Sequence, residues 1–256
     1  METKYHPEPY WSEVGKRIRE REDGKNVIAG DDEPYYRYKR KRFLQMLNKV
    51  DFTGKKVLEI GCGPGGNLME VLKKNPSRLT GVDISKEMVA LAGEKLGDKA
   101  DIHKVSGTEL PFEDQTFDVV FTATVLQHNT DEDMLLKLMG ELSRVGKDRV
   151  YLFERIDPKI MGDELCLGRP VSYYADIMAK NGYRLESVDN INIRVSYYLC
   201  GAIRKLLNPK NRKEGEPLNK MSIFLQNVSL PFTRVLDKIF TSKRDVAALE
   251  FVREEE

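Results

Sequence analysis

A carboxylate and a run of glycines stand next to each other at the end of an apolar segment. Glu59 lies within the apolar residues 57–60, and the glycine-rich stretch 61–66 follows directly. A second apolar segment, residues 79–84, contains another carboxylate, Asp83. Glycine lets a backbone pass close to a ligand at a strand-to-helix turn, and a carboxylate at the end of the next strand can bind a ribose diol. These residues therefore predict a site for an adenosine-containing cofactor.

The glycine spacing alone leaves two kinds of cofactor open. Gly61, Gly63 and Gly66 match the dinucleotide fingerprint, in which an acid follows about 20 residues later. An anionic pyrophosphate would be repelled by Glu59, whereas a cationic group would be attracted. Pro64 also removes a backbone N–H of the kind that phosphate-binding turns use. A cofactor with a sulfonium and an ammonium group, S-adenosylmethionine, is therefore favoured, and a nicotinamide dinucleotide stays as the alternative.

Four ordered segments resemble the class I S-adenosylmethionine-dependent methyltransferases, especially the small-molecule group called type 11. The segments are 57–65, 81–85, 110–120 and 125–128, and the resemblance extends from about Tyr35 to about Asn190. Two positions depart from the family's pattern. Ser106 stands where relatives often have an aspartate near the adenine, and residues 145–148 replace a Pro-Gly-Gly turn. The resemblance implies S-adenosylmethionine as the cofactor, S-adenosylhomocysteine as the product and direct in-line displacement as the reaction.

The resemblance also implies which residues contact the cofactor. Asp83 would bind the ribose, Ile84 would pack on the adenine, and the Ser106 hydroxyl would accept a hydrogen bond from the adenine amino group. Cys62 is interpreted as a small residue that fills the turn, because no basic partner that would activate it is near in the sequence. The predicted cofactor-binding residues are Tyr36, Glu59, Gly61, Cys62, Gly63, Asp83, Ile84, Ser106, Gly107, Thr108 and Thr124.

His128 is the titratable group that the family's fold would place near the transferred methyl. A neutral imidazole could accept the proton of a substrate hydroxyl, which makes His128 the candidate catalytic base. The alternative is a structural role in which the imidazole braces its loop, and many relatives carry a histidine here without a role as base. Gln127 shares both interpretations.

A parallel sheet is needed to bring these residues together. Ser85 is a predicted helix N-cap, and Thr130 with Asp133 resembles a capping box. Alternating strands and helices predict a Rossmann-like doubly wound sheet, and the resemblance implies seven mostly parallel strands with an antiparallel last strand. Strands are predicted at 56–60, 78–83, 101–105, 117–122, 149–153, 184–193 and 246–252, and helices at 65–74, 86–96, 131–144 and 172–181.

Two segments lie outside this alternation. Residues 1–50 are predicted to form a cap of helices and aromatics with a loop at 23–32, and residues 51–256 to form the catalytic domain. Within that domain, residues 195–244 are predicted to be a helical insertion with an apolar stripe, basic neighbours and a break near Pro231. Three interpretations are open: packing on the core or on a second subunit of a homodimer, a lid over an apolar acceptor, and peripheral attachment to a membrane surface.

Composition narrows the class of protein further. The 256 residues have a net charge of +1 and three cysteines, without a Cys-x-x-Cys pair. Near-neutral charge and the lack of an aromatic stacking motif disfavour nucleic acid, although an RNA methyltransferase and a non-catalytic cofactor-binding protein stay as alternatives. No metal, disulfide framework, signal peptide or transmembrane segment is predicted, and a cytoplasmic setting is expected. The predicted activity is methyl transfer, with O-methylation favoured, to a small-molecule or lipid-linked acceptor.

Overall fold

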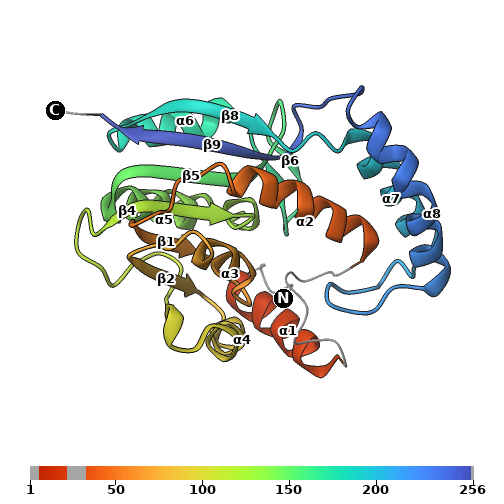
Figure 1. Cartoon of the computed structure of the whole chain (residues 1–256), viewed down its shortest axis with the longest axis horizontal. Coiled ribbons are helices and arrows are strands. Elements are labelled where there is room, and N and C mark those ends of the chain that lie inside the picture. The colour runs from red at the N-terminus through yellow and green to blue at the C-terminus, as the bar shows by residue number, and fades with distance from the viewer. Residues whose placement is uncertain (1–5, 22–32, 255–256) are drawn as a thin grey trace.

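A seven-stranded sheet runs through the centre of the computed structural model, which describes residues 6–21 and 33–254 (Figure 1). The strands are β1 (Lys56–Ile60), β2 (Arg78–Asp83), β3 (Asp101–Lys104), β4 (Phe117–Ala123), β5 (Gly146–Ile156), β8 (Tyr183–Asn190) and β9 (Asp245–Arg253). Their order is β3-β2-β1-β4-β5-β9-β8. Strands β1 to β5 pair in parallel, and β9 runs antiparallel to both of its neighbours. The predicted Rossmann-like sheet with an antiparallel last strand is confirmed.

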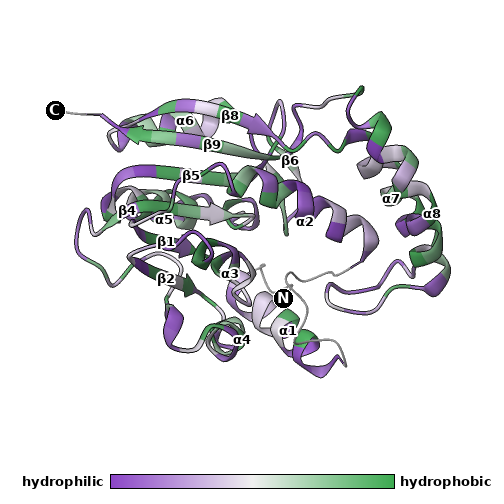
Figure 2. Ribbon diagram, in the orientation of Figure 1, coloured by the Kyte–Doolittle hydropathy of each residue, from purple (hydrophilic) through white to green (hydrophobic). Residues whose placement is uncertain are grey.

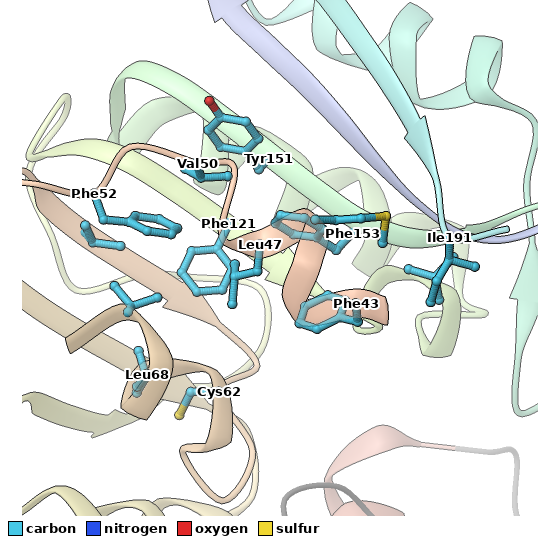
Figure 3. Close-up of a cluster of buried hydrophobic side chains, with 14 of the residues drawn as sticks. Phe43, Leu47, Val50, Phe52, Cys62, Leu68, Phe121, Tyr151, Phe153 and Ile191 are labelled. Carbon is cyan, nitrogen blue, oxygen red and sulfur yellow. The ribbon is translucent and has the colours of Figure 1, made fainter. Parts of the chain in front are cut away.

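Helices cover both faces of this sheet. They are α1 (Pro7–Glu20), α2 (Pro34–Leu47), α3 (Gly66–Leu72), α4 (Lys86–Leu96), α5 (Glu132–Val145), α6 (Val171–Lys180), α7 (Arg194–Leu207) and α8 (Lys220–Leu236). Buried residues of α2 and α3 pack on one face, whereas those of α5 and α6 pack on the other. Figure 3 shows the buried hydrophobic cluster on the face covered by α2 and α3, in which the ring centroids of Phe43 and Phe153 are 5.2 Å apart.

The central strands are apolar on both sides because both faces of the sheet are covered. In β4, Val119 and Phe121 belong to one core cluster and Val120 belongs to the other. Successive side chains of a strand point to opposite faces, so a strand covered on both sides needs a continuous apolar run. Such runs made the strands recognisable in the sequence, and both β1 and β2 begin and end at the predicted residues.

Helix starts depend on capping side chains, and the sequence placed only one of them correctly. The Ser85 hydroxyl accepts a hydrogen bond from the Met88 N–H, as predicted for the N-cap of α4. The Thr130 capping box is wrong, because Asp131 is the N-cap of α5 and accepts from the Met134 N–H at 3.2 Å. The Thr130 hydroxyl instead donates to a backbone carbonyl in a neighbouring loop.

The chain after β5 has more regular structure than predicted. β5 continues to Ile156 because β9 pairs with it from Arg149 onward on its outer side. A short antiparallel ribbon of β6 (Met161–Gly162) and β7 (Leu167–Gly168) follows where a loop was predicted. This ribbon brings the carbonyl groups of residues 164 and 165 next to the turn after β4.

Helices α7 and α8 lie between the last two strands of the chain, and Figure 1 places them at one end of the molecule's long axis. The side of α8 that packs on the protein is mostly polar: Ser222, Gln226 and Thr233 are buried there together with Leu230. Its apolar side is exposed, with Phe224 and Phe232 exposed by 59% and 71%. The insertion does pack on the core, through Cys200 and Leu230, as the first interpretation expects, but most of its apolar stripe stays exposed.

Two further sequence-based expectations concern the loop between the N-terminal helices and the prediction of no transmembrane segment. The loop predicted at residues 23–32 lies outside the described residues. Across residues 6–21 and 33–254, no helix has the length and apolar character that crossing a bilayer requires.

Candidate active site

The glycine turn between β1 and α3 adopts a backbone that other residues would strain. Gly61 has a φ of +70°, and a Cβ there would lie 2.3 Å from a methyl carbon of Val125. Gly63 has a φ of +51°, but a Cβ there would meet no atom within 4 Å. The first glycine is therefore required by packing, whereas the second exposes bare backbone to open space.

Asp83 ends β2 beside this turn. Its Oδ2 accepts a hydrogen bond from the Gly63 N–H at 2.9 Å, and its Oδ1 accepts one from the Ser85 N–H at 2.8 Å. Burial raises the pKa of this carboxyl to about 6, and the N–H donors oppose that rise. Each carboxylate oxygen has a second lone pair, so Asp83 still has acceptor capacity for the two hydroxyls of a ribose.

Glu59 lies behind the turn and is fully buried in β1. Its Oε1 accepts a hydrogen bond from the Asn67 amide, whose oxygen in turn accepts from the Arg40 guanidinium of α2. Burial raises the pKa of Glu59 to about 8, against the opposing influence of Asn67 and Arg40. Asn67 and Arg40 line the adjoining cavity, but Glu59 does not. A contact between Glu59 and a cationic ligand would therefore run through Asn67, and only the charged form of Glu59, which its raised pKa disfavours, would attract the ligand.

Glu154, a residue that the sequence analysis did not single out, holds the turn after β4. Its Oε1 accepts from the Val125 N–H at 3.0 Å, and its Oε2 accepts from the Gln127 N–H at 3.2 Å. Burial raises the pKa of this carboxyl. Thr124 in the same turn has a φ of +59°, which is uncommon for a β-branched residue. Glu154 thus fixes the backbone that places Thr124 and His128 at the cavity.

His128 lines the cavity with both ring nitrogens engaged. Its Nδ1 is 2.8 Å from the Leu165 carbonyl oxygen, which can only accept, so Nδ1 carries the hydrogen. The Gln127 amide then donates to Nε2 at 3.0 Å. Trp11 of α1 packs edge-on against the imidazole, with centroids 5.0 Å apart. Burial lowers the pKa of His128, so the ring is neutral at pH 7 but has a free lone pair only after Gln127 turns away.

A cavity of about 1080 Å³ lies at the carboxyl ends of the central strands. Doubly wound sheets bind ligands at this edge, where the strand order reverses between β1 and β4. The predicted residues that line the cavity are Tyr36, Gly61, Cys62, Gly63, Asp83, Ile84, Gly107, Thr124 and the candidate base His128.

Three predicted cofactor-binding residues lie outside the lining: Glu59, Ser106 and Thr108. Glu59 is covered by Asn67, as described above. The Ser106 hydroxyl accepts a hydrogen bond from the Thr108 N–H at 3.5 Å, a contact within its own loop. The neighbouring Gly107 reaches the cavity instead, with its backbone close to Ile84.

The insertion holds the N-terminal helices against the cavity. The guanidinium carbon of Arg204 in α7 lies 4.8 Å from the ring centroid of Tyr36, and its Nη1 donates to the Tyr36 hydroxyl at 3.3 Å. Arg204 also forms an ion pair with the buried Glu33, at 2.5 Å. The Tyr10 hydroxyl of α1 donates to Glu214, in the loop between α7 and α8, at 3.1 Å. None of these contacts could be read from the sequence, because the partners are about 170 to 200 residues apart.

The cavity lining carries a surplus of positive charge. Among the described residues, eight arginines and lysines line it against four carboxylates, which leaves this part of the lining with a net charge of +4 in a chain of net charge +1. Arg155 and Arg244 share the buried carboxylate of Asp157, at 3.1 Å and 3.9 Å. Arg194, at the start of α7, lines the same cavity. Sequence reasoning missed these arginines because each stands alone in its own segment.

The fold and the site define a class of protein. A doubly wound sheet with a glycine turn after β1 and a carboxylate at the end of β2 is an adenosine-binding arrangement. Among the described residues, no three His, Cys, Asp or Glu side chains are grouped so as to hold a metal ion. Residues 57–149 match the family model described as a methyltransferase domain. The chain carries a class I S-adenosylmethionine-dependent methyltransferase domain, and S-adenosylmethionine is the cofactor of that class.

Curated relatives and solved structures agree with this assignment. Phosphoethanolamine N-methyltransferase 1 of Zea mays is 27% identical over 154 residues, which are 58% of this chain and 28% of that protein. Norajmaline N-methyltransferase of Rauvolfia serpentina is 28% identical over 116 residues, 43% of this chain and 40% of that protein. The matches thus span less than half the length of these two relatives.

The fold has close counterparts at low sequence identity. Magnesium protoporphyrin IX methyltransferase of Synechocystis PCC 6803, solved with bound S-adenosylmethionine, superposes with a TM-score of 0.60 at 17% identity. That superposition covers 96% of this chain and 94% of the other. The likeness in fold therefore extends well beyond residues 57–149, the part that matches the family model.

Proposed function

We propose that this chain transfers the methyl group of S-adenosylmethionine to a small or lipid-linked acceptor that carries an anionic group. The observation that carries this proposal is one cavity of about 1080 Å³. It is lined by the glycine turn with Asp83 and also by Arg155 of β5, Arg194 of α7 and Arg244, the residue just before β9. Ligand pockets typically measure about 300–1,000 Å³, so this cavity has room for a cofactor and an acceptor together.

The residues of the glycine turn fit the cofactor. Asp83 keeps acceptor capacity for a ribose diol, and Gly63 leaves the backbone open beside it. Ile84 and Gly107 supply an apolar wall on which an adenine could lie. Arg40, already bound to the Gly66 carbonyl at 2.9 Å, is placed to meet the carboxylate of the amino-acid part. The bound cofactor supplies a methyl group activated by its attachment to a positively charged sulfur.

The proposed reaction is a direct in-line displacement. An acceptor oxygen attacks the methyl carbon, the carbon–sulfur bond breaks, and its electron pair stays on sulfur to give S-adenosylhomocysteine. The protein's main contribution is to align the two reactants and exclude water, which can supply roughly 7–11 kcal/mol in favourable cases. Oxygen is proposed because the neutral imidazole of His128 lies at the cavity wall and can take a hydroxyl proton once Gln127 turns away.

The charge of the lining supports an anionic acceptor. The cofactor carries a sulfonium, an ammonium and a carboxylate, so it adds one more positive charge to a lining of net charge +4. An acceptor with a phosphate or carboxylate group would offset that surplus, and arginine matches both groups with paired donors. The maize relative is named for phosphoethanolamine, an acceptor that carries a phosphate. Arg155, Arg194 and Arg244 are the proposed recognition residues.

Two further parts of the proposal concern organisation and setting. Residues 1–50 would act as a cap on a catalytic domain formed by residues 51–256, supported by the contacts of Tyr36 and Tyr10 with the insertion. A reducing, cytoplasmic setting agrees with three free cysteines, Cys62, Cys166 and Cys200.

The experiment that tests this function uses S-adenosylmethionine with an isotope-labelled methyl group and a fractionated cell extract. We expect label to enter an acceptor that binds to an anion-exchange resin. With that acceptor in hand, Arg244→Gln should raise the acceptor KM about tenfold or more, because a hydrogen bond to a charged group is worth roughly 1.5–3 kcal/mol. Its neighbour Lys243→Gln, an exposed residue outside the lining, is the matched control.

Two results would contradict the proposal. A neutral or cationic labelled product would contradict an anionic acceptor. Equal KM values for the Arg244 and Lys243 variants would contradict the proposed recognition site. Tight cofactor binding with no labelled product from any fraction would favour the non-catalytic alternative.

A further inference from the structure

Helix α8 is amphipathic in the reverse of the usual sense. Surface helices normally turn their apolar side to the core. In α8, the buried side consists of Ser222, Gln226, Leu230 and Thr233. The exposed apolar residues follow one another at spacings of mostly three or four along the other side and are exposed by 37–71%: Met221, Phe224, Leu225, Val228, Phe232, Val235 and Leu236. We call this set the outer face of α8. Ile239 and Phe240 extend it past the helix, exposed by 67% and 53%.

Buried hydrogen bonds fix this orientation. The Gln226 amide donates to Glu33 at 2.7 Å, and its oxygen accepts from the Tyr35 N–H at 3.1 Å. Near the other end of α8, the Ser196 hydroxyl of α7 lies 2.7 Å from the Thr233 hydroxyl. Turning α8 over would leave these polar groups buried without partners, each at a cost of about 1–3 kcal/mol in general, so the outward apolar face is built into the fold.

The surroundings of the outer face are basic. Neither α7 nor α8 contains an aspartate or a glutamate. The two helices expose Lys205, Lys220 and Arg234, whereas Arg204 is ion-paired with Glu33 and Arg194 lines the cavity. Asp237, which follows α8, is buried, and Figure 2 shows the alternation of hydrophobic and hydrophilic residues along the helix at the edge of the molecule. An exposed apolar strip among cations, without carboxylates on the same helices, is the arrangement of a helix that lies in the plane of a membrane interface.

We propose that the outer face of α8 docks on a bilayer surface that contains anionic phospholipid. A second copy of this chain would satisfy the apolar residues, but it would also bring Lys205, Lys220 and Arg234 of two copies together with no carboxylate on either helix pair to offset them. Anionic lipid headgroups offset the cations, and the acyl region accepts the phenylalanines. Helix α8 is not long or apolar enough to span the bilayer, so it would lie on the surface.

Docking would also deepen the proposed function. Tyr197 and Tyr198 of α7 line the cavity, and α7 packs against α8. A membrane-bound enzyme would therefore hold its cavity near lipid-linked acceptors in the same bilayer. This consequence rests on the proposed function, whereas docking itself does not.

The test is co-sedimentation of the full chain with vesicles, without any methyl donor. One set of vesicles is phosphatidylcholine alone, and the other also contains phosphatidylserine. We expect binding to the mixed vesicles. The double variant Phe224→Ser/Phe232→Ser should bind at least tenfold more weakly, because burying a Phe side chain contributes roughly 1.5–3 kcal/mol. Leu136→Ser/Val188→Ser changes two apolar residues that are exposed elsewhere, by 43% and 40%, and should bind like the unaltered chain.

The electrostatic part has its own variants. Lys205→Gln/Lys220→Gln should weaken binding to the mixed vesicles by roughly fivefold for each charge removed and should have little effect on phosphatidylcholine alone. Lys137→Gln/Lys147→Gln, at exposed positions outside α7 and α8, is the charge-matched control. Circular dichroism of each variant verifies that the fold is kept.

Three outcomes would overturn the proposal. The first is that neither kind of vesicle binds the chain. The second is that the Phe224/Phe232 double variant binds as well as its Leu136/Val188 control. The third is a stable dimer in sedimentation equilibrium that the Phe224/Phe232 variant converts to monomer, because a second copy would then cover the face. None of these measurements depends on methyl transfer, so a failed activity assay leaves them unaffected.

Discussion

Gly61 and Gly63 stand two residues apart but serve different requirements. Gly61 is fixed by packing, since any side chain there would collide with Val125. Gly63 has open space beside it, so glycine there suits the left-handed backbone and the close approach of the cofactor that we propose. Substitution at Gly63 therefore tests ligand binding with little disturbance of the core, whereas substitution at Gly61 mainly tests stability.

Gly63→Ala should weaken S-adenosylmethionine binding at least tenfold, because its methyl group occupies the ligand's approach. Gly54→Ala is the matched control, with a φ of +68° and nothing within 4 Å, at the opposite end of β1 from the turn. Both variants should lose about 1–2 kcal/mol of stability from the left-handed backbone. Titration calorimetry and chemical denaturation measure the two effects, and equal affinities in both variants would contradict a cofactor at Gly63.

The buried Glu59 should make stability depend on pH. Its pKa is about 4.5 in the unfolded chain and about 8 in the folded one, because burial disfavours the charged form. Between these values the folded state holds a proton that the unfolded state has lost, so stability falls as the pH rises. Between pH 6.5 and pH 7.5, this group should lower the free energy of unfolding of the unaltered chain by up to about 1.4 kcal/mol.

The matched variants are Glu59→Gln, which removes this titration, and Glu113→Gln, which removes an exposed carboxylate. Urea denaturation at the two pH values should show a smaller loss of stability in the first variant and an unchanged loss in the second. The same slope in all three proteins would mean that Glu59 is already charged in the folded state.

At the scale of elements, α7 positions a residue of the cavity that belongs to α2. Arg204 lies over the Tyr36 ring and is ion-paired with Glu33. Arg204→Lys keeps the positive charge near Glu33 but loses the planar group over the ring. A cation–aromatic contact is worth about 0.5–2 kcal/mol, so the cofactor Kd should rise roughly two- to thirtyfold with little change in stability.

The neighbouring exposed Lys205 provides the control, since Lys205→Gln removes a charge from the same helix without touching Tyr36. Calorimetry with S-adenosylhomocysteine measures the affinities. If both variants bind equally well, Tyr36 is held by its own helix and the insertion has no part in the cofactor site.

At the scale of the whole molecule, the cavity is bounded by segments from both ends of the chain. Trp11 of α1, Tyr36 of α2, Tyr197 of α7 and Val246 of β9 all line it. A ligand bound there contacts elements that otherwise meet only through side chains, so it should stabilise the fold as a unit. S-adenosylhomocysteine at 100 times its Kd should contribute about 2.7 kcal/mol, which corresponds to a Tm increase of roughly 5–11 °C for a chain of this size.

Nicotinamide adenine dinucleotide at the same concentration should leave Tm unchanged. A thermal shift with the dinucleotide and none with S-adenosylhomocysteine would reverse the choice of cofactor made from Glu59 and Pro64.

The sequence determined the sheet, and it predicted the residues of the proposed cofactor half of the site, because both depend on local chemistry. Gly61, Gly63 and Asp83 lie within 23 residues of one another, in two consecutive strand-and-turn units. Strands buried on both faces must be continuously apolar, and a turn with positive φ values requires glycine. Because these requirements involve residues that are neighbours in the sequence, the strands and the turn can be predicted without a structure.

Only the tertiary structure brings together the residues of the proposed acceptor half and shows which side of the insertion is exposed. Arg155, Arg194 and Arg244 come from three distant segments, and nothing local to any of them marks a shared site. The spacing of Phe224 and Phe232 establishes that α8 has an apolar side but not which side the protein covers. The buried hydrogen-bond partners of Gln226 and Thr233 determine which side of α8 is covered. Polar groups that are hydrogen-bonded inside a protein can be buried, and the apolar face of the helix then stays exposed.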